Sequence, residues 1–263
     1  MTMTRVELVK QLVRVRSLLA LAALAAVPVI YALTTTTKAG HRNGSQTGLY
    51  GAAPFSALNL AAAGLQFTAP LLLALVIALL GSALGAADRQ WGTLRYLYVQ
   101  PVSRARLLAG KCSALVVCCA LATAVVLLAA TLVGLIIFGW HPFHRLDAPT
   151  VPTATALLRL LEAGGYVVAC MLSVGTVALA LGLLLPGPAE ALGASVALVV
   201  VTTILDDQTS IDVAFPVHYW QRWTSLLNDT SAGLGTGLAV QAATTVLALA
   251  LAWTVLIRRD PAA

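Results

Sequence analysis

The sequence contains little charge, and this scarcity limits the classes of protein that it can encode. Asp, Glu, Lys and Arg make up only 10% of the 263 residues, whereas 59% are hydrophobic and the mean hydropathy is +0.89. A water-soluble globule of this length needs more polar side chains to cover its surface. The composition therefore excludes a soluble domain and predicts an integral membrane protein.

The sequence also lacks the alternating apolar and polar runs that mark the strands of an outer-membrane barrel. Six apolar runs instead have, or approach, the roughly 20 residues that a helix needs to cross about 30 Å of hydrocarbon. We expect an all-α, polytopic membrane protein with a single transmembrane domain over residues 1–263. The predicted spans are 17–33, 65–87, 115–138, 165–185, 189–205 and 234–257.

Motifs for catalysis and metal binding are missing as well. The four cysteines lie in or beside the spans without ligand spacing, and the four histidines are scattered over predicted loops. The segment nearest to a phosphate-binding loop, 105–112, begins with Ala105 instead of glycine and ends with Cys112 instead of Ser or Thr. We therefore predict no catalytic residue, no metal and no cofactor in this chain, so that energy for any transport comes from a partner or an ion gradient.

The positive charges predict the orientation, because Lys and Arg are retained in cytoplasmic loops. With the amino terminus inside, both termini are cytoplasmic, and most of the 16 basic residues lie on that side. They are Arg5, Lys10, Arg14, Arg16, Arg89, Arg95, Arg104, Arg106, Lys111, Arg258 and Arg259. Membrane lipid and topology account for the net charge of +6, so nucleic acid is not an expected partner. A composition rich in Ala, Leu and Val favours a bacterial inner membrane.

The first 16 residues have the pattern of an amphipathic helix on the membrane surface. One predicted face carries Glu7, Lys10, Gln11 and Arg14, and the other carries Val6, Leu8, Val9, Leu12 and Val13. Such a helix can be an anchor that sets the topology of the first span, or a lever that passes motion to the helix bundle.

Residues 88–111, between the second and third spans, have the pattern of a docking surface. Trp91, Leu94, Arg95 and Tyr98 follow one another at i, i+3, i+4 and i+7, so a helix would present them on one face. Aromatic residues with arginine are typical of binding hot spots. Pro101 is predicted to end this helix and Ser103 to cap the next one. An ordinary basic loop at the interface is the alternative.

Residues 206–232 form a predicted outer segment that is rich in aromatic residues. Phe215, Tyr219, Trp220 and Trp223 fall within nine residues. Such residues are enriched at the boundary between lipid headgroups and hydrocarbon, which favours a belt that anchors the loop there.

The loop between the second and third spans resembles that of ATP-binding cassette permeases of the type-2 exporter class. The similar residues are Asp88-Arg89-Gln90-Trp91-Gly92-Thr93-Leu94, Pro101-Val102-Ser103-Arg104 and Leu107-Leu108-Ala109-Gly110-Lys111, although Gln90 stands where the family often has an acid. The six-span layout with an amphipathic amino-terminal helix and an outer segment is also similar.

This resemblance implies a permease subunit that pairs with a second copy or a paralogue and with a separate ATPase subunit, which binds ATP and Mg. It implies that the predicted helix within residues 88–111, the coupling helix, docks on the ATPase through Arg89, Trp91, Leu94, Arg95 and Tyr98. It also makes the outer segment, re-entrant in that family, a candidate outer gate formed by Phe215, Tyr219, Trp220 and Trp223.

The predicted function is export of an amphipathic compound, such as a drug, an antibiotic, a lipid-linked molecule or a peptide, by alternating access. Two alternatives are a membrane scaffold or sensor that recruits a cytoplasmic partner, and a small ion-coupled carrier. The predicted spans hold no ionisable group at their centres, where a working carrier would keep one, and this disfavours ion coupling.

Overall fold

The structure is a computed structural model that describes residues 7–9, 11, 13–37, 49–90, 103–145, 149–208, 215–228 and 233–258. Six helical stretches in this part of the chain are long and apolar enough to cross a membrane, which confirms the predicted all-α, six-span fold. They are Val15–Thr36, Ala57–Ala87, Arg104–Ile137, Thr153–Leu184, Pro188–Leu205 and Leu234–Arg258.

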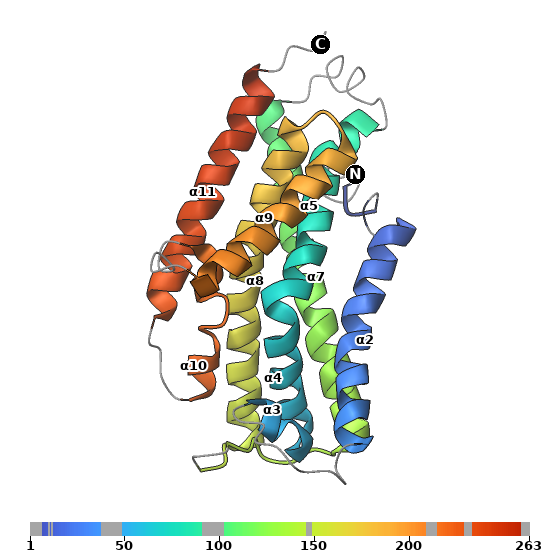
Figure 1. The fold of residues 1–263 in the computed structure, drawn as a ribbon, viewed down its shortest axis with the longest axis vertical. Coiled ribbons are helices and arrows are strands. Elements are labelled where there is room, and N and C mark those ends of the chain that lie inside the picture. The colour runs from blue at the N-terminus through green and yellow to red at the C-terminus, as the bar shows by residue number, and fades with distance from the viewer. Residues whose placement is uncertain are drawn as a thin grey trace.

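The helices stand side by side in one bundle (Figure 1). The long elements are α2 (Val15–Thr37), α4 (Ala57–Thr68), α5 (Ala74–Gln90), α7 (Arg104–Ile137), α8 (Thr153–Leu184), α9 (Pro188–Gln208) and α11 (Leu234–Arg258). The short ones are α3 (Leu49–Ala52), η2 (Ala53–Phe55), η3 (Ala69–Leu73), η5 (Pro216–Tyr219) and α10 (Thr224–Leu227). The described residues contain no strand, only an isolated bridge between Phe143 and Val151.

Several helices begin before their apolar run does, because a capping residue decides where a helix starts. The Ser103 hydroxyl accepts a hydrogen bond from the Arg106 amide at 3.4 Å, which confirms the predicted cap of α7. The Ser56 hydroxyl likewise accepts from the Asn59 amide at 3.2 Å, so that the second span starts well before the predicted residue 65.

The second span is interrupted at Pro70. This residue lies in η3, a π-helical turn between α4 and α5. Proline has no amide hydrogen, so Pro70 cannot donate to the carbonyl of Gln66, four residues earlier. The carbonyl oxygen of Gln66 is thereby left for another donor.

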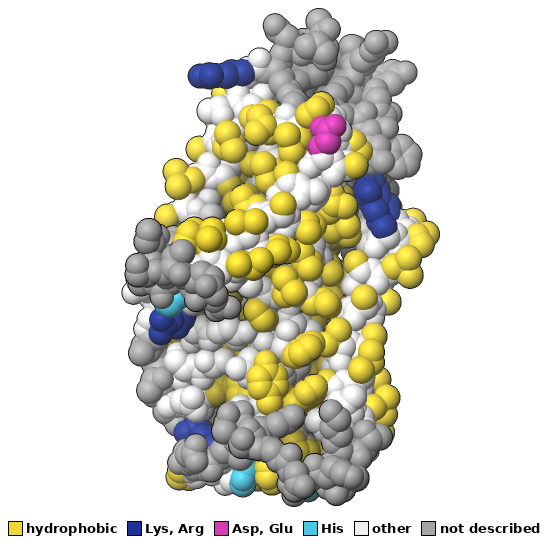
Figure 2. Space-filling view, viewed as in Figure 1, with side chains coloured by type: hydrophobic (Ala, Val, Ile, Leu, Met, Phe, Trp, Pro, Cys, Tyr) yellow, Lys and Arg dark blue, Asp and Glu magenta, His cyan; other side chains and the backbone are white. Residues whose placement is uncertain are grey.

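α5 and α8 form the centre of the bundle, and glycines bring their backbones together. A Cβ atom added to Gly85 would lie 2.5 Å from the carbonyl oxygen of Leu179 and 2.8 Å from the Cα of Gly182. Around this centre the other helices expose many apolar side chains, and hydrophobic groups cover much of the face seen in Figure 2. Such a surface suits contact with lipid.

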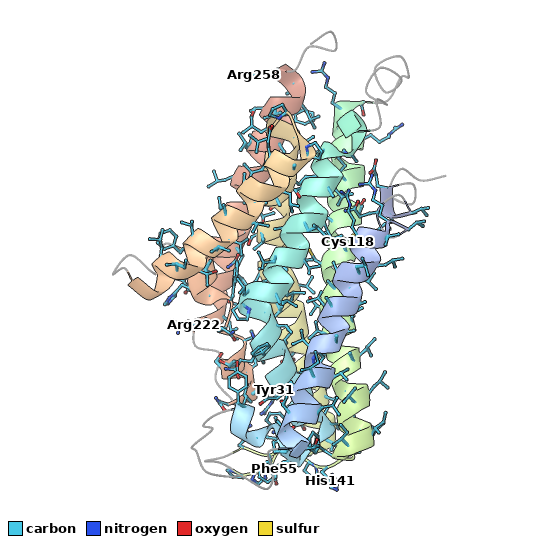
Figure 3. All side chains as sticks on the ribbon, turned by 45° about the vertical axis from the view of Figure 1, so that its right-hand side comes forward. Tyr31, Phe55, Cys118, His141, Arg222 and Arg258 are labelled. Carbon is cyan, nitrogen blue, oxygen red and sulfur yellow. The ribbon has the colours of Figure 1, made fainter. Side chains whose placement is uncertain are left out.

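Four helix ends that border the predicted cytoplasmic segments lie toward the same end of the bundle. They are the start of α2, the end of α5, the start of α7 and the end of α11 (Figure 1). The connection between α7 and α8 lies at the opposite end, near Phe55 and His141 (Figure 3).

Candidate functional site

The coupling helix predicted from the sequence falls almost entirely outside the described residues. α5 ends at Gln90 and α7 begins at Arg104, so that Trp91, Leu94, Arg95 and Tyr98 lie between the described parts. Arg89 is in the last turn of α5, where only the backbone is described. The proposed docking role of these five residues therefore stays a prediction.

Arg104, at the start of α7 just after this loop, is hydrogen-bonded to another helix of the bundle. An Nη atom of Arg104 donates to the carbonyl oxygens of Leu256 and Ile257, at 3.0 and 2.7 Å. These carbonyls belong to the last turn of α11, where carbonyl oxygens have no amide N–H of the same helix to accept from. The bonds join the start of α7 to the end of α11.

Lys111 makes a second connection near this end of the bundle. Its ammonium group donates to the carbonyl oxygen of Leu84 on α5 at 2.7 Å, and the side chain is fully buried. The sequence placed Lys111 among the cytoplasmic charges, and its role between α5 and α7 was not anticipated. The two helices that border the loop are thus tied together.

The amino-terminal segment does not have the orientation expected of a helix lying on the membrane surface. The side chains of Glu7 and Gln11 are only 4% and 1% exposed, whereas Val9 and Val13 are 54% and 71% exposed. The amide of Gln11 donates to the carbonyl oxygen of Leu80 at 3.0 Å. The predicted arrangement, with this polar face in water, is therefore wrong for these residues.

Gln11 finds its hydrogen-bond partner inside the protein, whereas the exposed valine side chains need no such partner. Burial and the charge of Arg16 lower the pKa of Arg14, and the nearby carboxylate of Glu7 opposes them. Glu7, Arg14 and Arg16 thus lie close enough to interact through their charges. Residues 1–6, 10 and 12 lie outside the described part of the segment.

The aromatic residues of the outer segment are buried against other helices. Tyr219, Trp220 and Trp223 are 4%, 2% and 0% exposed, and Phe215 is half-buried. A belt in contact with lipid headgroups requires exposed rings, so this interpretation is wrong for the three buried residues. Their burial makes residues 215–228 part of the helix bundle; residues 209–214 and 229–232 are not described.

Two hydrogen bonds attach this segment to α8 and α11, and a third joins the two helices beside it. The Tyr166 hydroxyl donates to the carbonyl oxygen of Tyr219 at 2.9 Å. The Gln241 amide donates to the carbonyl oxygen of Pro216 at 2.7 Å and accepts from the Ser173 hydroxyl. The segment therefore rests on side chains from two long helices.

These contacts lie partway along α8, away from its ends. At 1.5 Å per residue, Tyr166 is about 20 Å from the start of α8 and about 27 Å from its end. In agreement, Arg222 lies between the end of the bundle that carries Arg258 and the end that carries His141 (Figure 3). The segment thus reaches well into the bundle.

One more hydrogen bond connects the segment to the break in the second span. The Gln221 amide donates to the carbonyl oxygen of Gln66 at 3.0 Å. This is the carbonyl whose α-helical donor, four residues later, Pro70 removes. The interruption in the second span therefore provides a binding point for the outer segment.

Close packing holds the same region in register. A Cβ atom on Gly237 of α11 would lie 2.2 Å from the Tyr166 hydroxyl oxygen and 3.1 Å from the Cβ of Tyr219. Only glycine fits between these two tyrosines. We call Gln66, Tyr166, Ser173, Gly237 and Gln241 the seat of the outer segment.

The sequence pattern indicates the aromatic residues of the outer segment but none of the residues of its seat. A polar side chain within an apolar span was the available signal for Gln66 and Gln241, since such residues are costly in lipid unless they bond within the protein. Pro70, four residues after Gln66, was the signal for a free carbonyl. Nothing in the sequence indicated that these distant residues meet.

The fold defines a polytopic helical membrane protein whose residues 215–228 pack against the helix bundle, and comparison with known families names its class. A family model for ABC-2 family transporter proteins matches residues 5–187, more than half of the chain. The chain therefore belongs to the ABC-2 transporter family, as the loop resemblance implied, and is a permease subunit of an ABC transporter. Comparison with curated proteins gives no match.

The matched range has a structural meaning. It contains the first four spans and the loop at 91–102, and it ends between α8 and α9. The outer segment and its contacts on α11 lie beyond it. Membership of the family implies pairing with an ATP-binding subunit, whereas the outer segment must be interpreted from its own contacts.

Proposed function

We propose that this permease exports an amphipathic compound, and that closure of a separate ATPase subunit on ATP and Mg switches it between inward-facing and outward-facing states. The family match over residues 5–187 carries this proposal, since it covers the loop that resembles an ATPase-docking segment. In the proposal, Arg89, Trp91, Leu94, Arg95 and Tyr98 contact the ATPase, and two permease subunits, identical or paralogous, enclose the path.

The contacts within the bundle suggest how motion at the loop reaches the outer segment. The loop joins α5 to α7, and Lys111 ties these helices together. α5 is in backbone contact with α8 through Gly85 and Gly182. α8 in turn holds the outer segment through Tyr166. A displacement of α5 would therefore be passed to the segment through α8, because close-packed helices move together.

In this mechanism the outer segment is the gate. Phe215, Tyr219, Trp220 and Trp223 close the path on the outer side in the conformation described, and release from the seat opens it. Their burial supports this role, because large rings that fill the interior exclude water and solute.

The proposal includes an orientation and a location. Both termini and the loop between α5 and α7 face the cytoplasm, and the connection between α7 and α8 faces outward. The common end shared by α2, α5, α7 and α11 supports this arrangement (Figure 1). A bacterial inner membrane is the proposed site.

The docking assignment is tested by alanine substitution of Trp91 and Tyr98 together. Loss of two aromatic anchors should lower recovery of the ATPase with affinity-purified permease at least about tenfold, the loss typical of removing a hot spot. Trp140→Ala is a matched control, because Trp140 is half-exposed at the opposite end of the bundle. Insertion should be unchanged in both variants.

Equal recovery of the ATPase with the double variant and with Trp140→Ala would refute the docking assignment. Uphill transport by the purified permease alone would refute the wider proposal, because a permease without its own ATPase site cannot use ATP. The same result would favour the ion-coupled carrier.

A further inference from the structure

We propose that Gln66, Trp220, Gln221 and Trp223 form a binding site for an uncharged amphipathic compound that carries hydroxyl or amide groups. As a substrate site it rests on the proposed export function, which it narrows to one chemical class. Binding itself needs no ATPase and can be measured on the permease alone.

Four buried polar atoms of these residues lack a hydrogen-bond partner in the described part of the chain. They are the indole nitrogens of Trp220 and Trp223 and the side-chain oxygens of Gln66 and Gln221. Both indoles are at least 98% buried. A buried polar group without a partner costs about 1–3 kcal/mol, so native proteins seldom keep four of them in one region without a reason.

These atoms belong to one neighbourhood. Trp220, Gln221 and Trp223 lie within four consecutive residues, and Gln221 is bonded to the main chain of Gln66. Pro70 removes the α-helical donor of the Gln66 carbonyl and lies in the π-helical turn that interrupts the second span. The break in the span and the outer segment thus meet at Gln66 and Gln221, two of the four residues that carry the unsatisfied atoms.

The kind of atom indicates the kind of ligand. Two indole N–H groups can donate and two amide oxygens can accept, which matches a ligand group that both accepts and donates, as hydroxyls and amides do. The flat indole faces provide apolar contact for the remainder of the molecule. A purely apolar compound would leave all four atoms unsatisfied.

The charges of the described residues disfavour an ionic ligand. The described part of the outer segment, residues 215–228, contains no Asp or Glu that could neutralise a cation. Its one arginine, Arg222, is exposed and interacts with the ring of His218 at 2.8 Å. An anion would therefore have no buried cation from this segment. An uncharged headgroup fits the site better than either ion.

Tryptophan fluorescence can report on this site directly. The protein has five tryptophans, and the variant with Trp91→Phe, Trp140→Phe and Trp253→Phe keeps only Trp220 and Trp223. This variant is placed in lipid nanodiscs and titrated with decyl glucoside, decyltrimethylammonium, decyl sulfate or free glucose. The three amphiphiles share one chain and differ in headgroup charge. We expect a saturable change in emission with decyl glucoside, and no saturable change with the two ions or with glucose.

Gln66→Leu in the same background removes one acceptor and leaves the main-chain bond to Gln221 in place. It should raise the Kd for decyl glucoside about fivefold, as expected for one lost hydrogen bond. Thr254→Val is the control, because the Thr254 hydroxyl is exposed and bonds only within its own helix. Gln66→Met serves the same purpose if Gln66→Leu does not fold.

The proposal is overturned if all three amphiphiles act alike, if glucose acts as strongly as decyl glucoside, or if Gln66→Leu and Thr254→Val bind equally. The four atoms would then be satisfied by water. If decyl glucoside does not bind to the permease although the complex with its ATPase transports normally, the site is rejected and the export function stands. If decyl glucoside binds but the permease has no ATPase partner and transports nothing, the export function is rejected and the site stands.

Discussion

Gly237 is the residue on which the seat of the outer segment depends most directly. It lies on α11 between the Tyr166 hydroxyl and the Cβ of Tyr219, and both atoms are buried. Tyr166 cannot retreat freely, because its hydroxyl donates to the Tyr219 carbonyl. A methyl group at this position therefore competes with a hydrogen bond that holds the segment.

We expect Gly237→Ala to lower the free energy of unfolding by about 1–3 kcal/mol, the usual cost of overpacking a core. The measurement is thermal or denaturant unfolding of the purified permease in detergent. Gly235→Ala is the matched control, since a Cβ there meets no atom within 4 Å. It should be neutral or slightly stabilising, because alanine favours helix over glycine.

A double-mutant cycle identifies Tyr166 as the residue that Gly237→Ala displaces. Tyr166→Phe removes the oxygen nearest to the new methyl group, so the two changes together should cost less than the sum of the single changes. Strict additivity, or an equal effect of Gly235→Ala, would show that Gly237 does not support the seat.

Individual residues were the hardest feature to predict from the sequence. The aromatic cluster of the outer segment was found because composition alone reveals it, but its burial was not, since buried and interfacial tryptophans have the same local sequence. Lys111 has the sequence context of a surface charge and is buried only because α5 offers a carbonyl to it. Contacts between residues far apart in the chain decide these cases.

At the scale of helices, the close packing of α5 against α8 is the contact that tolerates substitution least. Gly81 and Gly85 have the G-x-x-x-G spacing that lets membrane helices approach closely. The atoms that added Cβ groups would meet include main-chain atoms of α8, which cannot rotate away as a side chain could. The helix pair is therefore intolerant of any added atom.

Gly85→Ala should therefore cost about 3 kcal/mol or more in unfolding free energy, at or above the upper part of the overpacking range, and lower the yield of folded protein. Gly165→Ala, on α8 itself, is the control, because a Cβ there meets no atom within 4 Å. Both variants are compared by thermal unfolding and by the fraction that elutes as a single species. Equal behaviour of the two would contradict a close α5–α8 contact.

The positions of the helices in the sequence could largely be predicted. Which face of each helix points to lipid and which to the protein interior could not. Six spans and the Ser103 cap follow from local patterns of hydropathy and capping. The amino-terminal segment shows the limit, because an amphipathic pattern separates two faces without saying where each goes. Lipid is as apolar as a protein core, so Val13 can face outward while Gln11 bonds to Leu80.

At the scale of the whole molecule, the two ends of the bundle differ in charge in a way that bears on orientation. Among described residues, the end that carries the α5–α7 connection has Arg14 and Arg16 at the start of α2, Arg104, Arg106 and Lys111 in the first turns of α7 and Arg258 at the end of α11, while Arg145 and Arg159 lie before and in the first turns of α8, toward the opposite end. The excess of basic residues predicts that the first end is cytoplasmic.

Single cysteines tell the two orientations apart. In a variant with Cys112, Cys118, Cys119 and Cys170 replaced by alanine, we expect Arg145→Cys in intact cells to react with a maleimide that cannot cross membranes. Arg106→Cys, whose parent side chain is exposed at the start of α7, should react only after the cells are opened. The reverse pattern would place the α5–α7 loop outside, where no ATP-binding subunit could reach it, and the coupling proposal would fail with the orientation. If both positions react in intact cells, the protein is inserted in both directions. The pull-down of the ATPase is then repeated on the fraction with a cytoplasmic α5–α7 loop.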